Sequence, residues 1–274
     1  MASSNCLANY YQRALRADEV LAQIDTYYPT GPTLHQLAPL DQLHIGGMAA
    51  SNRLLARLDP ATHPRVLDIG AGLGGLMRLG ASLGFKMTGL DITHGFSALN
   101  QALTTRVKLP NSPPLAWVTG NASAQPFADN CLDAVLFQHS LLNMPDPAKV
   151  IAQSHRVLRP GGQLVMHEII SGPNVAQLRY PVPWAATPEH SHLLTLTALT
   201  DLLQAGGFTI EHVDDWSDTA LAWRQQQRQK EQTPRQAILS PQWVFGEQFL
   251  SMGKHLVTNL TQRAIKVVEI HVSC

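Results

Sequence analysis

Residues 66–75 read Val66-Leu-Asp-Ile-Gly-Ala-Gly-Leu-Gly-Gly75, an apolar run that passes directly into a cluster of glycines. The apolar run predicts a buried strand over residues 65–69, and the glycines predict the tight turn that follows it. The segment from Leu76 to Leu83 then has the pattern of a helix. A strand, a turn and a helix in this order are typical of a parallel α/β unit.

The same alternation continues along the chain. Further predicted strands lie at Lys86–Leu90, Leu115–Thr119, Leu132–Phe137, Gln163–His167, Phe208–Val213 and Ala264–Val272. Helical stretches separate the first five strands, which predicts parallel crossovers and a doubly wound sheet. The polar residues that follow the strands are Asp91, Asn121, Gln138, His139 and Glu168. Ligands of such sheets bind beyond the carboxyl ends of the strands, so we expect these residues at the functional edge.

Composition excludes several classes of protein. Lys+Arg and Asp+Glu both number 20, so a formal net charge of +0 favours neither nucleic acid nor an anionic membrane as a partner. No stretch approaches the roughly 18 apolar residues of a membrane span. The three cysteines, Cys6, Cys131 and Cys274, form no C-x-x-C pair. The lack of a disulfide framework or an apparent export signal predicts a cytoplasmic protein.

The glycine cluster alone fits either a dinucleotide or an adenosyl ligand. Gly70, Gly72 and Gly75 satisfy G-x-G-x-x-G, and Gly70, Gly72 and Gly74 satisfy G-x-G-x-G. Asp68 at the strand end distinguishes them, because a carboxylate repels a pyrophosphate and attracts an ammonium or sulfonium. Asp91 ends the next strand and can accept hydrogen bonds from ribose hydroxyls, which suits an adenosyl ligand and NAD alike.

Four motifs in register carry a family resemblance. They are Val66–Gly75, Gly89-Leu-Asp91, Asn121-Ala-Ser-Ala-Gln-Pro-Phe127 and Arg156-Val-Leu-Arg-Pro-Gly-Gly162. Their order and spacing resemble the class I S-adenosylmethionine-dependent methyltransferases. Leu40-Asp-Gln-Leu-His-Ile-Gly-Gly47 and Tyr180-Pro-Val-Pro-Trp-Ala185 are similar to segments of the small-molecule sarcosine/dimethylglycine methyltransferases, near the ubiquinone-biosynthesis methyltransferases. The resemblance implies a Rossmann-like, mostly parallel sheet of seven strands.

The resemblance also implies a cofactor, S-adenosyl-L-methionine, and a role for each matching residue. Asp68 with Gly70, Ala71, Gly72 and Gly74 would face the methionine end of the cofactor, Asp91 its ribose and Ile92 the face of its adenine. Asn121 and Ala122 would reach the adenine edge. Gln138 and His139 would line the chamber for methyl transfer. Asn121 stands where many relatives carry Asp, and its carbonyl can still accept from an adenine amino group.

Three residues are candidates for catalysis or for contact with the acceptor molecule. His139 is the candidate catalytic residue, either as a base or as a wall of the chamber. His44 and Trp184 are candidate substrate contacts, and packing is the alternative for both. His190 and His192 are the close histidine pair, but neither H-x-x-x-H nor H-E-x-x-H occurs, so we expect no metal site.

The predicted organisation is an N-terminal helical cap over residues 1–60 and one methyltransferase domain over residues 61–274. Residues 171–195 and 216–262 are predicted insertions on the substrate side. The predicted function is methyl transfer to an N, O or C nucleophile of a small molecule. A NAD-dependent oxidoreductase and a non-catalytic module that binds a partner remain alternatives, and the acceptor and the oligomeric state stay open.

Overall fold

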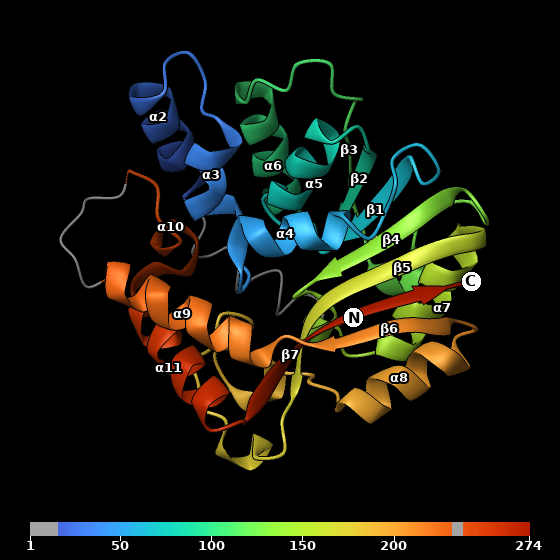
Figure 1. Cartoon of the computed structure of the whole chain (residues 1–274). Coiled ribbons are helices and arrows are strands. Elements are labelled where there is room, and N and C mark those ends of the chain that lie inside the picture. Colours follow the sequence, from blue (N-terminus) through green and yellow to red (C-terminus); the bar gives the residue numbers. More distant parts are fainter. Residues whose placement is uncertain (1–15, 232–237) are drawn as a thin grey trace.

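The structure is a computed structural model that describes residues 16–231 and 238–274. Its centre is a seven-stranded sheet with the strand order β3-β2-β1-β4-β5-β7-β6 (Figure 1). The strands are β1 (Arg65–Ile69), β2 (Lys86–Asp91), β3 (Ala116–Thr119), β4 (Leu132–Gln138), β5 (Leu158–Ser171), β6 (Thr209–Asp215) and β7 (Ile265–Ser273). The doubly wound sheet of seven strands predicted from the sequence is confirmed.

The order of the strands creates a ligand-binding crevice. The strands β1 to β5 pair in parallel, whereas β7 runs antiparallel to both β5 and β6. The chain order reverses at β1, which has β2 on one side and β4 on the other. Connections therefore leave the carboxyl ends of β1 and β4 in opposite directions, and ligands of doubly wound sheets bind at such a reversal.

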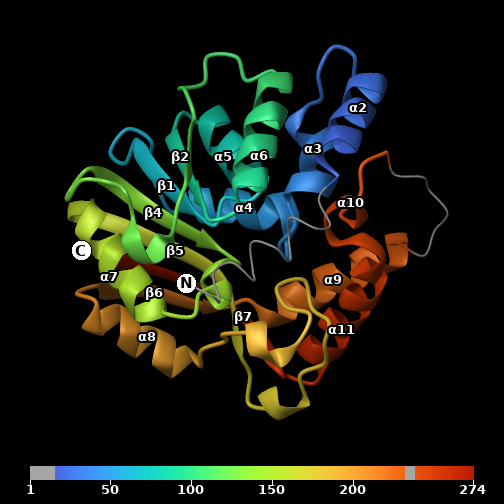
Figure 2. The same cartoon turned by 180° about the vertical axis from the view of Figure 1, so that it is seen from behind.

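Helices cover both faces of the sheet (Figures 1 and 2). They are α2 (Ala17–Tyr27), α3 (Leu34–Asp41), α4 (Gly47–Leu55), α5 (Gly75–Ser82), α6 (His94–Arg106), α7 (Pro147–Val157), α8 (Leu196–Ala205), α9 (Ser217–Glu231), α10 (Gln242–Phe245) and α11 (Phe249–Thr261). None of these described helices is long and apolar enough to cross a membrane.

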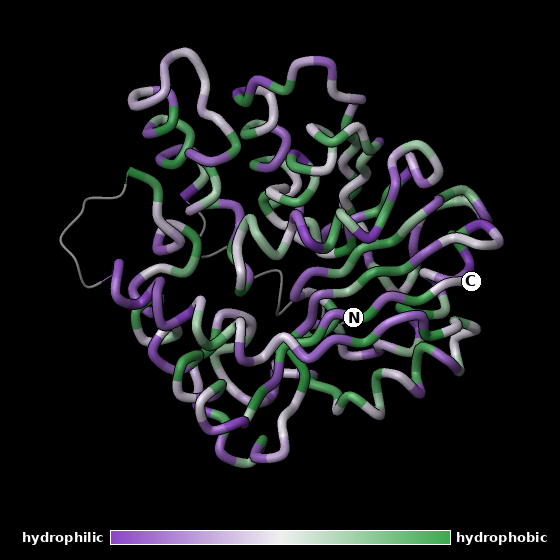
Figure 3. Tube along the Cα trace, in the orientation of Figure 1, coloured by the Kyte–Doolittle hydropathy of each residue, from purple (hydrophilic) through white to green (hydrophobic). Residues whose placement is uncertain are grey.

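Successive side chains of the central strands pack into hydrophobic clusters on opposite faces of the sheet. Val66 and Ala134 pack with residues of α4 and α5, whereas their neighbours Leu67 and Val135 pack with residues of α7 and α8. This follows from the period of two in a strand, where adjacent side chains point to opposite faces. Figure 3 shows the resulting hydrophobic stretches along the strands at the centre of the sheet.

The N-terminal helices α2, α3 and α4 pack onto the sheet domain. Arg78 of α5 and Asp41 of α3 form an ion pair with 2.7 Å between Nη2 and Oδ2, and the two side chains are 0% and 2% exposed. Arg78 Nη1 also donates to Asn100 Oδ1 and Thr104 Oγ1. The predicted cap thus shares its buried contacts with α5 and α6. Residues 1–15 of that cap, and residues 232–237 of the predicted insertion, lie outside the described residues.

The largest difference from the predicted elements is in β5. The sequence predicts a strand at Gln163–His167, but β5 extends over Leu158–Ser171. Residues 159–162 are Arg-Pro-Gly-Gly, a composition that predicts a break. In the structure this stretch is part of β5, and it is the irregular part: the register between β5 and β4 shifts between Leu132 and Ala134. The remaining strand ends agree with the prediction or differ from it by one or two residues.

Candidate active site

The turn after β1 brings three strand ends together. Gly70 (φ +79°) and Gly72 (φ +50°) have the left-handed backbone that favours glycine. A Cβ atom on Gly70 would lie 2.5 Å from Cβ of Ser140, so this turn packs directly on the turn after β4. The Gly70 amide donates to Leu90 O at 2.8 Å, and the Gly72 amide donates to Asp91 Oδ2 at 2.9 Å.

Asp91 supports both the glycine turn and the helix that follows β2. Its Oδ2 accepts from Gly72, and its Oδ1 accepts from the amide of Thr93 at 2.8 Å. Burial raises the pKa of Asp91, and these two hydrogen bonds oppose the shift. The Thr93 hydroxyl also donates to this carboxylate, which keeps one further acceptor position for a hydroxyl of a ligand.

Asp68 is a buried carboxylate without a partner. It is 3% exposed and forms no hydrogen bond with any other described residue. Burial, and then the negative charge of Asp91, raise the pKa of Asp68 to about 7. A buried carboxylate is stable in its ionised form only when a positive group or hydrogen-bond donors compensate it. The site therefore suits a ligand that brings a positive charge.

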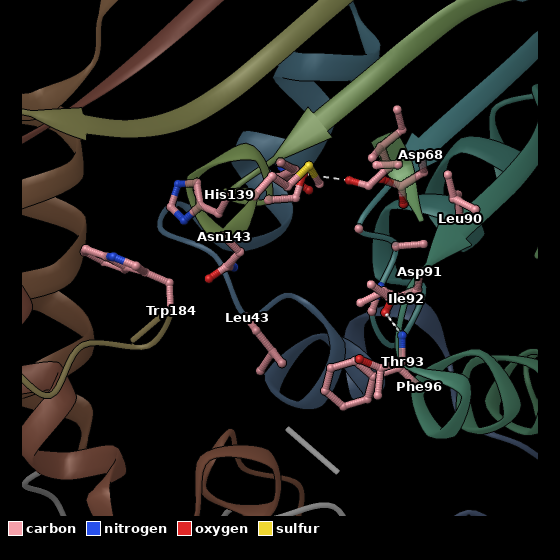
Figure 4. Close-up of a pocket in the computed structure, with 18 of the residues that line it drawn as sticks. Leu43, Asp68, Leu90, Asp91, Ile92, Thr93, Phe96, His139, Asn143 and Trp184 are labelled. Carbon is pink, nitrogen blue, oxygen red and sulfur yellow. Dashed lines mark hydrogen bonds between the residues drawn. The ribbon is translucent and has the colours of Figure 1, made fainter. Parts of the chain in front are cut away.

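These strand ends open into a cavity of about 590 Å³ (Figure 4). The predicted cofactor residues that line it are Asp68, Gly70, Ala71, Gly72, Asp91, Ile92, Asn121, Ala122 and Gln138. The other three candidates, His44, His139 and Trp184, line the same cavity. Gly74 is not among the lining residues. It precedes α5 with φ +81°, and a Cβ atom there would lie 2.0 Å from Oδ1 of Asn100. Its glycine is required by packing.

One end of the cavity has the features of a nucleoside pocket. Ile92 lines it together with Phe96, which lies in the first turn of α6 (Figure 4). Asn121 Oδ1 accepts from the Ser123 amide at 2.8 Å and caps the 3-10 helix Ala122–Ala124. The Asn121 carbonyl therefore has one remaining lone pair for an adenine amino group.

The other end of the cavity contains imidazole groups. His139 follows β4 with φ +52°, and its ring stacks on His167 with 5.0 Å between centroids and 6° between planes. The His44 ring meets His139 edge-on, with 5.9 Å between centroids. Burial, followed by the neighbouring His167 and His44, lowers the pKa of His139 well below its usual value. The His139 imidazole is therefore neutral at pH 7, the form that can accept a proton.

His44 and Trp184 both line the cavity and pack in the protein. The His44 Nε2 donates to Gly47 O at 3.0 Å, and burial lowers the pKa of His44 to about 3. Trp184 is 4% exposed, and its Nε1 donates to Ser191 Oγ at 2.9 Å. Both side chains are thus held rigidly at the wall of the chamber.

Several lining residues escaped sequence reasoning. Asn143 lies on the same turn as His139, so a closer examination of residues after β4 would have found it. Phe96 follows Asp91 by five positions and is accessible to the same reasoning. Leu43 and Phe245 also line the cavity, but they come from the cap and from α10, and no local pattern marks them. Among residues 16–231 and 238–274, no group of three or more His, Cys, Asp or Glu is arranged to hold a metal ion.

Part of the chain matches known methyltransferases in sequence. Residues 67–166 match the family described as a methyltransferase domain. The ubiquinone/menaquinone biosynthesis C-methyltransferase of Roseobacter denitrificans is 34% identical over 121 residues, which cover 43% of this chain and 48% of that protein. The chain spans about half the length of the curated relatives it matches, with 60% and 48% for two of them.

Two solved structures share the fold across nearly the whole chain. A provisionally assigned sarcosine dimethylglycine methyltransferase from Galdieria sulphuraria has a TM-score of 0.68 at 16% identity, covering 91% of this chain and 97% of that one. Geranyl diphosphate C-methyltransferase from Streptomyces coelicolor A3(2), in complex with S-adenosyl-L-homocysteine, has a TM-score of 0.67 at 15% identity, covering 100% and 98%. Residues 67–166 of the chain therefore match a methyltransferase domain, and the resemblance to methyltransferases predicted from the sequence is confirmed.

Proposed function

We propose that this chain transfers the methyl group of S-adenosyl-L-methionine to an N, O or C nucleophile of a small molecule. The observation that carries the proposal is Asp68, a buried carboxylate with no partner among the described residues, at the wall of the cavity and next to a glycine turn. A cationic ligand gains from this carboxylate, whereas the pyrophosphate of NAD is repelled by it. This favours the adenosyl cofactor over the NAD-dependent alternative.

Each part of the cavity wall has a proposed task. Asp68 would pair with the ammonium group of the methionine end, and the Gly70 and Gly72 turn would allow the close approach of backbone. Asp91 would accept from the ribose hydroxyls. Ile92 and Phe96 would enclose the adenine between apolar side chains. His44, His139 and Trp184 would form the acceptor chamber at the other end of the same cavity.

The cofactor, when bound, supplies an electrophilic methyl group on a cationic sulfur. The remaining work of the chain is to hold the nucleophile in line with that methyl group, to exclude water and to accept a proton where the nucleophile carries one. The neutral imidazole of His139 would take such a proton as a weak base, since its surroundings lower its pKa, and a role as a wall of the chamber fits it as well. Trp184 and His44 restrict the orientations that the acceptor can adopt.

The test is a transfer assay with S-adenosyl-L-methionine tritiated in its methyl group and an extract of small metabolites as the acceptor pool, followed by mass spectrometry of the labelled product. We expect labelled product from the wild type and weak cofactor binding by Asp68→Asn, with a loss of about 2–4 kcal/mol. Asp133→Asn is the matched control, because Asp133 is also 3% exposed but pairs with Arg65 and Arg159 near the opposite end of β4.

Three results would contradict the proposal. Tight binding of NAD without binding of S-adenosyl-L-methionine would favour an oxidoreductase. Cofactor that is bound but never consumed across a broad pool of acceptors would favour a non-catalytic module. Equal cofactor affinity of Asp68→Asn and Asp133→Asn would remove the argument from the buried carboxylate.

A further inference from the structure

A buried carboxylate outside the cavity holds the turn that carries His139. Glu168 lies near the carboxyl end of β5 and is 2% exposed. Its Oε1 accepts from the amide of Ser140 at 2.8 Å and from the amide of Leu141 at 2.9 Å. Glu168 itself is not among the residues that line the cavity. It therefore contacts the turn and not the cavity.

The turn held by Glu168 connects both halves of the site. It begins at His139, whose φ of +52° is unusual for a residue with a side chain and persists only where the surroundings enforce it. It ends at Asn143, which lines the cavity with His139 (Figure 4). Ser140 Oγ donates to Ile69 O at 2.6 Å, so the same turn is attached to the end of β1 beside Gly70.

Stability alone gives little reason for a carboxylate at this position. Glu168 forms no ion pair with any described residue, and its Oε2 has no hydrogen-bond partner. Burial raises the pKa of Glu168 to about 7 in spite of the backbone amides that lower it. A buried ionisable group with incomplete partners stabilises a fold poorly. Buried ionisable groups with strongly shifted pKa values cluster at functional sites.

We propose that Glu168 is a positioning residue for methyl transfer, which holds His139 and Asn143 in the acceptor chamber through the amides of Ser140 and Leu141. The inference rests on the proposed function of the same site. It predicts that loss of the Glu168 carboxylate disturbs the transfer step more than it disturbs the binding of cofactor, because the adenosyl end of the cavity is built from β1, β2 and β3.

The experiment compares Glu168→Ala, Glu168→Gln and the control Asp133→Asn in the tritiated-methyl assay with the metabolite extract. S-adenosyl-L-homocysteine affinity is measured by calorimetry, and melting curves show that each variant is folded. With the acceptor identified by mass spectrometry supplied at saturation, Glu168→Ala should lower kcat about 100-fold, the effect of a small misplacement of reacting groups. Its affinity for S-adenosyl-L-homocysteine should stay within about threefold. Glu168→Gln keeps an oxygen that can accept from both amides, so its loss should be about 10-fold.

Hydrogen exchange provides a readout that does not need an acceptor. The amides of Ser140 and Leu141 should lose protection in Glu168→Ala and keep it in Asp133→Asn. Unchanged protection, an unchanged kcat, or equal losses of kcat and cofactor affinity in Glu168→Ala would each overturn the positioning role. A wild type that labels no product would overturn the proposed function instead, and hydrogen exchange would then decide whether Glu168 holds the turn.

Discussion

Binding of the cofactor should release a proton from Asp68. The pKa of Asp68 is about 7, because burial and the charge of Asp91 both disfavour its ionised form. About half of the molecules therefore carry a proton there at pH 7. A cationic ligand beside the carboxylate favours ionisation and lowers that pKa again. We expect the release of about half a proton at pH 7, and an affinity that rises up to about tenfold per pH unit between pH 5.5 and 7.

Calorimetry can measure this proton directly. Titrations of S-adenosyl-L-methionine at pH 7 in buffers of different ionisation enthalpy give the number of protons released from the slope of the apparent enthalpy. The amino group of the ligand also titrates, near about 7.7–8.0. At pH 7 only about 0.1–0.2 of this amino group is unprotonated, so its contribution in either protein is smaller than the release of about half a proton expected from Asp68. Equal proton release by wild type and Asp68→Asn, with an affinity independent of pH, would refute the reasoning.

The same shift predicts how the unliganded protein responds to pH. The pKa of Asp68 is raised in the folded state from 3.8 to about 7, so between these values the folded state binds more protons than the unfolded state. The contribution of Asp68 to stability is therefore present at low pH and is lost as the pH rises through that window. We expect unliganded Asp68→Asn to melt higher than the wild type at pH 8, and cofactor to reverse that order.

Three further variants test other parts of the site. Asp91→Ala should weaken cofactor binding by about 2–4 kcal/mol, measured by calorimetry. It should also lower the free energy of unfolding without ligand by about 1–3 kcal/mol in melting curves, because the carboxylate accepts from two backbone amides. An unchanged cofactor affinity would exclude Asp91 as the ribose partner. His139→Ala should lower turnover by about 10²–10⁴-fold if the imidazole accepts a proton, with cofactor affinity preserved; full turnover of labelled methyl would exclude both of its proposed roles. Gly70→Ala should destabilise the fold by about 1–3 kcal/mol, because the backbone of Gly70 is left-handed and the new methyl group would meet the turn after β4. A melting temperature equal to that of the wild type would contradict the packing of the two turns.

The features predicted from sequence are those that short segments determine. The strand before Gly70, the glycine turn and the acidic residue at the end of β2 lie within 26 positions of one another, from 66 to 91. Each follows from local hydrophobic pattern and glycine content. The seven-stranded sheet followed from a resemblance, since local patterns do not show that β7 inserts between β5 and β6.

The features that sequence reasoning missed depend on contacts between distant segments. His167 stacks on His139 because β4 and β5 are neighbours in register, with Gln138 paired to His167. This contact contributes to the lowered pKa of His139, so no reading of the residues near His139 could give its protonation state. Likewise, the sequence predicts Glu168 just after a strand end, whereas it lies within β5 near the carboxyl end, and its partners lie 28 and 27 positions earlier.

The ion pair between Arg78 and Asp41 has a consequence for how the chain unfolds. Detachment of α3 would leave the guanidinium of Arg78 in the interior without its anion, and breaking a buried pair in this way costs about 3–5 kcal/mol. That penalty is of the same order as the total stability of many domains. Partial opening of the N-terminal helices therefore costs a substantial part of the free energy of global denaturation. Thermal denaturation of the protein should be a single cooperative transition in scanning calorimetry, with no earlier shoulder from the helices that precede β1.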